Sequence, residues 1–146
     1  MNENISFNEM AFYYYLSQVF ECRYHPTFNT SRGILEYDLF LPEFNILIEY
    51  DSYYYHLERF DFDYLKDIVA SNELGFELIR IREKPLDKVS ELSKFVSRDG
   101  NDYKSLDRAI ARVLIYIRRE FNLLFDLSVS TYRDRRSIAL LKAMKI

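Results

Sequence analysis

The segment from Ile34 to Glu83 constrains the fold most, because it places acidic side chains inside short apolar strands. Two apolar runs, residues 34–40 and 46–50, are typical of β-strands. The first carries Glu36 and Asp38 at alternating positions, and the second carries Glu49 and is followed by Asp51. Taking a carboxylate out of water costs free energy unless a cation meets it. The segment therefore predicts a sheet whose acidic residues share a cationic partner, and we expect that partner to be a divalent metal ion.

The order of elements in this segment predicts a hairpin followed by a crossover. A short turn around Pro42 and Asn45 separates the two strands, which should pair antiparallel. A helix from about 61 to 74, ended by Gly75 in the C′ position, then leads to a third strand over 77–82. Because a strand, a helix and a returning strand form a crossover, the third strand should lie parallel to the second.

The expected fold class is α/β of the α+β type, with a mixed central sheet flanked by helices. Ser6 and Glu9 form a capping-box pattern at the start of a helix that should run to about Phe20. We expect residues 1–98 to form the core and residues 99–146 a basic helical extension that contacts DNA or another copy of the chain. The other expected elements are a polar connector over 22–32, a loop over 52–56, a short helix over 85–96, a loop over 97–102, an amphipathic helix over 103–121, a brief strand over 127–129 and a last helix over 137–144.

The net charge of −3 hides an asymmetry along the 146 residues. Residues 1–103 hold 10 Lys and Arg against 19 Asp and Glu, whereas residues 104–146 hold 10 against 4. The basic part is suited to phosphate contacts and the acidic part to cations, although an ordinary exposed basic helix face explains the first equally well. A single cysteine, Cys22, excludes an internal disulfide and a four-cysteine zinc site. With no long apolar run and no signal-peptide pattern, we expect a cytoplasmic protein that does not enter a membrane.

Asp38, Glu49 and Asp51 are the candidate metal ligands, since alternation on the two paired strands brings them towards one another. Their oxygens suit Mg²⁺, with Mn²⁺ as a substitute. His56 follows the second strand and is a candidate general base. Asp63 and Lys66 are one helical turn apart, so they are expected to orient His56 or to contact a phosphate through the lysine.

Each of these residues also has a purely structural interpretation. Carboxylates on strands often face solvent, and Asp63 with Lys66 is compatible with an ordinary surface ion pair. Capping alone explains Glu9, and His25 has no partner pattern in the sequence. A glycine-rich phosphate loop, a Gly-x-Ser-x-Gly elbow and a His-Glu-x-x-His motif are all missing, which argues against kinase, serine-hydrolase and zinc-protease chemistry.

The order of these residues resembles a known nuclease family. Glu36-Tyr-Asp38, the turn through Pro42, Ile48-Glu-Tyr-Asp51, His56 and Asp63-x-x-Lys66 precede the strand over 75–83. This pattern resembles the very-short-patch mismatch-repair endonucleases, and within that group the phage homing endonucleases of the EDxHD family in the PD-(D/E)xK superfamily. The resemblance covers residues 6–83.

This resemblance implies a restriction-endonuclease-like fold, a magnesium-dependent cut in DNA and a metal at Asp38. It also implies catalytic positions for Glu9, Asp51, His56 and Asp63. Glu49-x-Asp51 stands where the superfamily usually has an acid-x-lysine pair, so the missing lysine would have to be replaced by His56 or Lys66. Ser52 and Tyr55 depart from the glycine and tryptophan that are common in relatives, and the zinc-binding cysteines of the repair enzymes are absent.

The leading hypothesis is a magnesium-dependent DNA endonuclease encoded by a phage or a mobile element. The alternative is a catalytically inactive module of the same fold that engages a protein partner, and a homodimer is compatible with both. The residues expected to contact DNA are Arg108, Arg112, Arg118, Arg119, Arg133, Arg135 and Arg136.

Overall fold

The computed structural model describes residues 6–145, which form two compact units. Residues 21–99 form the first, called here the sheet unit. The described residues up to Phe20 and from Gly100 onwards form the second, called the helical unit. The boundary near residue 99 is close to the one expected from the sequence, but the first helix packs with the C-terminal helices instead of with the sheet.

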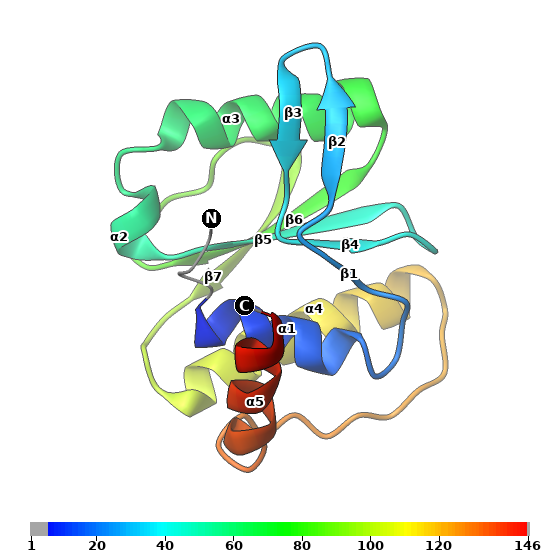
Figure 1. Cartoon of the computed structure of the whole chain (residues 1–146), viewed down its shortest axis with the longest axis vertical. Coiled ribbons are helices and arrows are strands. Elements are labelled where there is room, and N and C mark those ends of the chain that lie inside the picture. The colour runs from blue at the N-terminus through cyan, green and yellow to red at the C-terminus, as the bar shows by residue number, and fades with distance from the viewer. Residues whose placement is uncertain (1–5, 146) are drawn as a thin grey trace. The chain divides into compact units, whose positions relative to one another are not determined.

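A five-stranded mixed sheet forms the centre of the sheet unit (Figure 1). Its strands are β1 (Arg23–Tyr24), β4 (Leu39–Leu41), β5 (Ile46–Asp51), β6 (Glu77–Glu83) and β7 (Ser93–Arg98), in the order β1-β4-β5-β6-β7. The pairs β1·β4 and β4·β5 are antiparallel, whereas β5·β6 and β6·β7 are parallel. The α+β fold class, the hairpin and the parallel third strand that the sequence predicts are therefore confirmed.

The crossover between β5 and β6 is also confirmed. It consists of α3 (Phe60–Ile68), which continues as a π-helical turn, η1 (Val69–Leu74), and ends at Gly75 with a φ of +71°. A glycine suits this left-handed position because it lacks the Cβ that would be strained there. The helix packs against the sheet through a shared apolar core of Leu35, Tyr37, Phe40, Leu47, Val69, Ala70 and Leu78.

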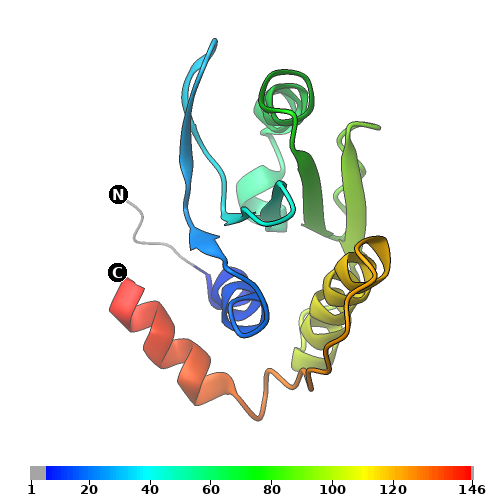
Figure 2. The same ribbon diagram turned by 90° about the vertical axis from the view of Figure 1, so that its right-hand side faces the viewer.

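The strand expected over 34–40 is split in two. Its first part, β3 (Gly33–Glu36), pairs with β2 (Thr27–Thr30), and only the part after Asp38 joins the sheet as β4. The β2–β3 hairpin projects from the sheet on the side that carries α3 (Figures 1 and 2), where Ser31 donates hydrogen bonds to Glu73. The expectation of a polar connector over 22–32 is wrong, because Thr27–Thr30 pairs with β3 as a strand of alternating exposed and half-buried residues, and Gly33 closes the turn with a φ of +96°.

Two further expectations for the sheet unit are wrong. The helix expected over 85–96 is instead a turn and an irregular segment followed by β7, which pairs along β6 in parallel. Apolar residues at positions 86, 89 and 92 imitate a helical period, but the open edge of β6 gives the following residues a pairing partner. The loop expected over 52–56 contains a four-residue helix, α2 (Tyr53–His56).

The helical unit consists of α1 (Phe7–Leu16), α4 (Tyr103–Glu120) and α5 (Arg135–Lys145). Ser6 accepts a hydrogen bond from the Glu9 amide, as the capping pattern predicts, although α1 ends at Leu16 and not near Phe20. The strand expected over 127–129 is wrong, since that segment has no regular structure. None of the helices within residues 6–145 combines the length and the apolar character that a membrane span requires.

Candidate functional site

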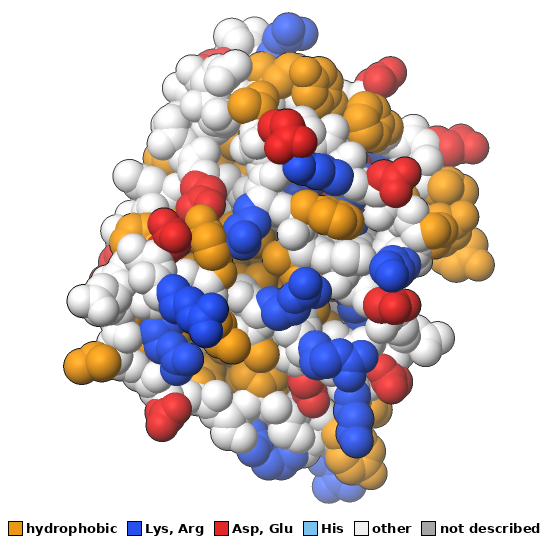
Figure 3. All heavy atoms as spheres, turned by 180° about the vertical axis from the view of Figure 1, so that it is seen from behind, with side chains coloured by type: hydrophobic (Ala, Val, Ile, Leu, Met, Phe, Trp, Pro, Cys, Tyr) orange, Lys and Arg blue, Asp and Glu red, His pale blue; other side chains and the backbone are white. Residues whose placement is uncertain are grey.

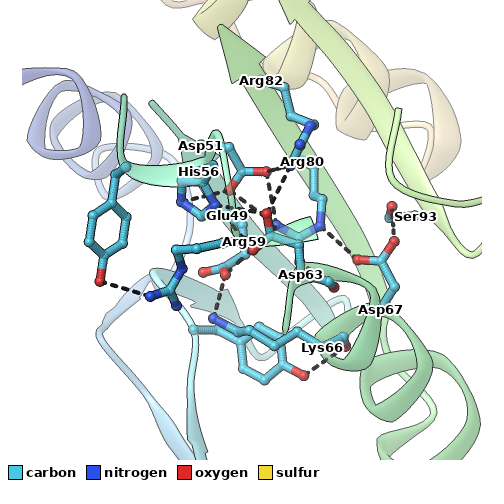
Figure 4. Close-up of polar contacts among 12 residues, drawn as sticks. Glu49, Asp51, His56, Arg59, Asp63, Lys66, Asp67, Arg80, Arg82 and Ser93 are labelled. Atoms are coloured by element: carbon cyan, nitrogen blue, oxygen red, sulfur yellow. Dashed lines mark hydrogen bonds and ion pairs between the residues drawn. The ribbon is translucent and has the colours of Figure 1, made fainter. Parts of the chain in front are cut away.

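A buried group of charged side chains lies between β5, β6 and α3 (Figure 4). It combines four carboxylates with three permanent cations and one histidine, and we call it the charge network. Each member is less than one-tenth exposed. The members are Glu49, Asp51, His56, Asp63, Lys66, Asp67, Arg80 and Arg82.

The registry of two parallel strands explains how the network forms. Glu49 and Asp51 of β5 stand beside Arg80 and Arg82 of β6, so acids and cations are cross-strand neighbours on one face. Helix α3 covers this face and contributes further charged residues from successive turns, since positions three or four apart share one side of a helix. The fold therefore places opposite charges from three elements in one buried layer.

Arg80 is the centre of this layer. Its Nη1 donates to both carboxylate oxygens of Asp51 at 3.1 and 2.9 Å, and its Nε donates to Asp67 at 2.6 Å. Its Nη2 donates to the backbone carbonyl of Asp63 at 2.9 Å. Burial alone lowers the pKa of Arg80, but the attraction of Asp51, Glu49 and Asp67 outweighs it and raises that pKa. Arg80 is thus fixed as a cation.

His56 lies between two carboxylates of the network. Its Nδ1 is 2.8 Å from Asp63 Oδ2, and its Nε2 is 3.4 Å from Asp51 Oδ1. Arg82 Nη1 donates to the same two carboxylates, at 2.6 Å to Asp51 and 3.2 Å to Asp63. Burial raises the pKa of Asp51 in spite of the opposing effect of Arg80. For Asp63, burial also acts upwards, but the hydrogen bond with His56 and the charge of Arg80 prevail and lower its pKa.

A second set of contacts joins the hairpin to α3 through Glu49. Glu49 Oε1 accepts from the Asp38 amide at 2.9 Å, and Asp38 Oδ2 accepts from the Tyr50 amide at 2.7 Å. Lys66 Nζ donates to Glu49 Oε2 and lies 4.6 Å from the centre of the Tyr37 ring. Burial raises the pKa of Glu49, but Lys66 and Arg80 outweigh this and lower it. Glu49 is therefore a carboxylate held beside a lysine, while Asp38 is only half-buried.

The structure brings together a different set of residues from the one expected. Asp38 contacts Glu49 through its backbone amide, while its carboxylate accepts from the Tyr50 amide. Asp51 is bound by Arg80 and Arg82 instead of facing those two acids. Within the described residues of the sheet unit, the group whose ligand atoms all lie within 4.8 Å of one another is Asp51, His56 and Asp63. The carboxylates on the strands do have cationic partners, as their burial requires. Many of these partners are lysine and arginine side chains of the protein itself.

Arg80, Arg82 and Asp67 are members of the network that sequence reasoning missed. The signal was present in the alternation Leu78-Ile79-Arg80-Ile81-Arg82, which puts both arginines on one face of a buried strand. Asp67 accepts hydrogen bonds from Ser90 and Ser93 in addition to Arg80.

Other residues singled out from the sequence have separate surroundings. Glu9 lies on α1 of the helical unit, where its amide is capped by Ser6. His25 Nδ1 lies 2.7 Å from Glu36 Oε2, an ion-pair geometry that its sequence context did not predict. The seven arginines expected to contact DNA all lie in the helical unit, and Arg118 and Arg135 are the half-buried ones among them. Arg118 donates to Phe125, Arg133 to Asp134 and Ser128, and Arg135 to Tyr132. The exposed ones are Arg108, Arg112, Arg119, Arg133 and Arg136.

Comparison of the chain with family models, with curated proteins and with solved structures found no match. The resemblance to the EDxHD endonucleases therefore stays an expectation that rests on the order of residues in the sequence.

Two places in the sheet unit differ in how well they fit a divalent cation. Asp51, His56 and Asp63 fit poorly, because two guanidinium groups already bind the same carboxylates and would repel a further cation. Asp38 and Glu49 fit better, although Lys66 donates to Glu49 and the Arg80 guanidinium lies 3.9 Å from it. Solvent reaches Asp38, and a carboxylate oxygen that accepts one hydrogen bond still has a second lone pair. Their oxygens are also the hard ligands that Mg²⁺ prefers.

Proposed function

We propose that the sheet unit is a metal-dependent DNA endonuclease in which Asp38 and Glu49 hold Mg²⁺ or Mn²⁺. The observation that carries this proposal is the pairing of Lys66 with Glu49 next to Asp38. Two acids and a lysine are the groups that the superfamily uses to cut phosphodiester bonds. The sequence has no lysine two positions after Glu49, and Lys66 of α3 supplies an ammonium group at that carboxylate instead.

The roles of the site residues follow from their contacts. A bound divalent ion would offset charge on the scissile phosphate and make a water molecule more acidic. Lys66 has three N–H donors, of which Glu49 takes one, so the ammonium can also donate to a phosphoryl oxygen as negative charge develops there. Glu49 keeps this ammonium oriented. Asp38, being half-buried, provides the side of the site that solvent and substrate can reach.

We assign His56 a positioning role in place of the general-base role expected from the sequence. A general base must offer a ring nitrogen to the proton that it removes. Both ring nitrogens of His56 face carboxylates. Together with Asp51, Asp63 and Arg82, it ties the end of β5 to α3, the two elements that carry Glu49 and Lys66.

Plasmid cleavage tests this proposal. The purified protein should convert supercoiled DNA to open or linear forms with Mg²⁺ or Mn²⁺, and EDTA should stop the reaction. Asp38→Asn should lose at least about 10²-fold in rate, in the range seen when one group that stabilises the transition state is removed. Asp87→Asn, a matched change at an exposed acid in the sheet unit, should cleave like the wild type. Folded wild-type protein that leaves varied DNA intact with both metals would contradict the proposal.

A second candidate is a catalytically inactive module of this fold that engages a protein partner. The charge network favours it, because Lys66, Arg80 and Arg82 already pair with its carboxylates, so these acids have cationic partners without a metal ion. Calorimetric titration separates the two candidates. Absence of Mg²⁺ and Mn²⁺ binding up to millimolar concentrations supports the inactive module, whereas binding that Asp38→Asn abolishes supports the enzyme.

Several expectations from the sequence belong to the same proposal. They are DNA as the substrate, a homodimer that cuts two strands, a phage or mobile-element source and a cytoplasmic location. Sedimentation of the protein with and without duplex DNA measures the assembly state directly, and one copy per duplex at saturation would argue against the dimer.

A further inference from the structure

Helix α4 carries a straight row of basic side chains, which we call the basic stripe. Its members are Lys104, Arg108, Arg112 and Arg119, and all four are exposed. Intervals of four, four and seven residues keep them within about 80° of one another around a helix of 3.6 residues per turn. The distance from the first to the last along the axis is about 22 Å at a rise of 1.5 Å per residue.

Acidic side chains of α4 lie away from the stripe. Asp107 accepts hydrogen bonds from the amide and hydroxyl of Thr131, and Glu120 points roughly 120° away from the centre of the stripe by helical geometry. Ile115, which is 37% exposed, is the apolar residue among the four cations. Figure 3 shows Lys and Arg side chains on one face, interspersed with Asp and Glu side chains.

The opposite face of α4 holds the helix in place. Its apolar residues are buried, and Asp102 caps the N-terminus by accepting from the Ser105 amide at 2.9 Å. A buried apolar face and a cap fix the rotation of the helix about its axis, so the stripe is displayed as a constant surface. The buried residues are Leu106, Ala109, Ile110, Val113, Leu114 and Ile117.

The stripe is defined by exposure and by spacing along one helix. Three other arginines of the helical unit lie outside that row and have contacts within the chain. Arg133 is bound to Asp134 and Ser128, and Arg135 donates to Tyr132 while its guanidinium stacks on that ring. Arg118 is only partly exposed and donates to Phe125. Lys104, which the sequence pattern did not single out, extends the exposed row by one helical turn.

We propose that the basic stripe binds the phosphate backbone of duplex DNA. Cations spaced along about 22 Å of a rigid helix face complement a strand whose phosphates follow one another every 3.4 Å along the duplex axis. Lys and Arg bind phosphate oxygens through charge-assisted hydrogen bonds. Because contacts to phosphates position a protein on the duplex without reading its bases, the stripe supplies sequence-independent affinity and orientation. The choice of DNA as the ligand rests on the proposed nuclease function, but the binding itself requires no catalysis.

Fluorescence anisotropy with a labelled 20-base-pair duplex in EDTA tests the stripe, because hydrolysis cannot occur there. The test variant replaces all four stripe residues with glutamine, which keeps a high helix propensity. The matched control removes the same charge from exposed cations of the sheet unit. Its substitutions are Arg23→Gln, Arg32→Gln, Lys88→Gln and Lys94→Gln. Circular dichroism and thermal unfolding establish that both variants fold.

If each of the four stripe residues contacts one phosphate, the logarithm of the wild-type association constant should fall linearly with the logarithm of the salt concentration. The expected slope is about −3.6, at about 0.9 per contact. The stripe variant should lose most of that slope and about 10²-fold in affinity at low salt, whereas the control should retain the slope. Equal binding by the stripe variant and the control overturns the proposal. A wild type that binds anionic vesicles but not the duplex overturns it as well.

The catalytic and binding proposals fail separately. Asp38→Asn should bind the duplex like the wild type in EDTA, because Asp38 lies outside the stripe. If the wild type binds the duplex through the stripe but cleaves no DNA, the nuclease proposal fails and the binding proposal stands. If the stripe variant cleaves DNA and binds the duplex like the wild type, the binding proposal fails and the nuclease proposal stands.

Discussion

Replacing Arg80 with leucine removes the cation at the centre of the charge network. Arg80 is 1% exposed and donates to both oxygens of Asp51, to one oxygen of Asp67 and to the Asp63 carbonyl. Removing one partner of a buried ion pair costs about 3–5 kcal/mol, because the remaining charge is left without compensation. Asp51 keeps Arg82 and Asp67 keeps its two serines, so we expect a loss within that range and not above it.

Urea unfolding at pH 7, with intrinsic tyrosine fluorescence and circular dichroism as probes, measures this loss. Arg32→Leu, at an exposed arginine of the same unit, should change the free energy of unfolding by no more than about 0.5 kcal/mol. Acidification should narrow the gap between Arg80→Leu and the wild type, because protonation removes the uncompensated charge. Adding Asp51→Asn to Arg80→Leu should also recover part of the loss.

A result below about 1 kcal/mol for Arg80→Leu would refute this reasoning, because buried ion pairs that lose one partner cost several times more. It would mean that water enters the layer between β5, β6 and α3 and compensates the acids. In that case the pairing of acids and cations within the network would no longer support the second candidate, the inactive module that binds no metal ion.

Three further predictions concern pH, the helical unit and the crossover. The pKa values of Glu49 and Asp63 are lowered on folding, so these carboxylates stabilise the protein at a pH above their unfolded pKa values. This stabilisation is lost as the pH falls through their folded pKa values. Urea unfolding at several pH values should therefore show a free energy of unfolding that decreases below about pH 5. Tyr15→Phe removes a hydrogen bond to Asp134 of 2.6 Å and should lower the free energy of unfolding of the helical unit by about 1–3 kcal/mol in thermal unfolding, and an unchanged midpoint would contradict it. Gly75→Ala meets no atom within 4 Å, so its cost should be the left-handed backbone alone, about 1–2 kcal/mol by urea unfolding.

Local sequence signals were sufficient for much of the fold. The turn between 41 and 45, the crossover ended by Gly75 and the cap at Ser6 each depend on neighbouring residues, and each is present in the structure. The segments that were mispredicted depend on partners distant in sequence. Residues 93–98 form a strand because they pair with the edge of β6. The periodicity of apolar residues in the local sequence gives no information about that partner.

The candidate site shows the same division. The sequence identified Asp38, Glu49 and Lys66, and the structure brings these three into one set of contacts. It could not show that Asp51 is paired with arginines of β6, because that pairing depends on the register of two parallel strands. Burial of the charges depends on how α3 covers the sheet. The physical premise that strand carboxylates need cations was sound, but it did not specify which cations they would meet.

The location of a bound Mn²⁺ ion tests the central claim most directly. A crystal of the protein grown with Mn²⁺ gives an anomalous diffraction peak wherever the ion is held. We predict a peak in contact with the carboxylates of Asp38 and Glu49, and its loss in Asp38→Asn crystals. A peak between Asp51 and Asp63, or none at any carboxylate of the sheet unit, would contradict the proposed site.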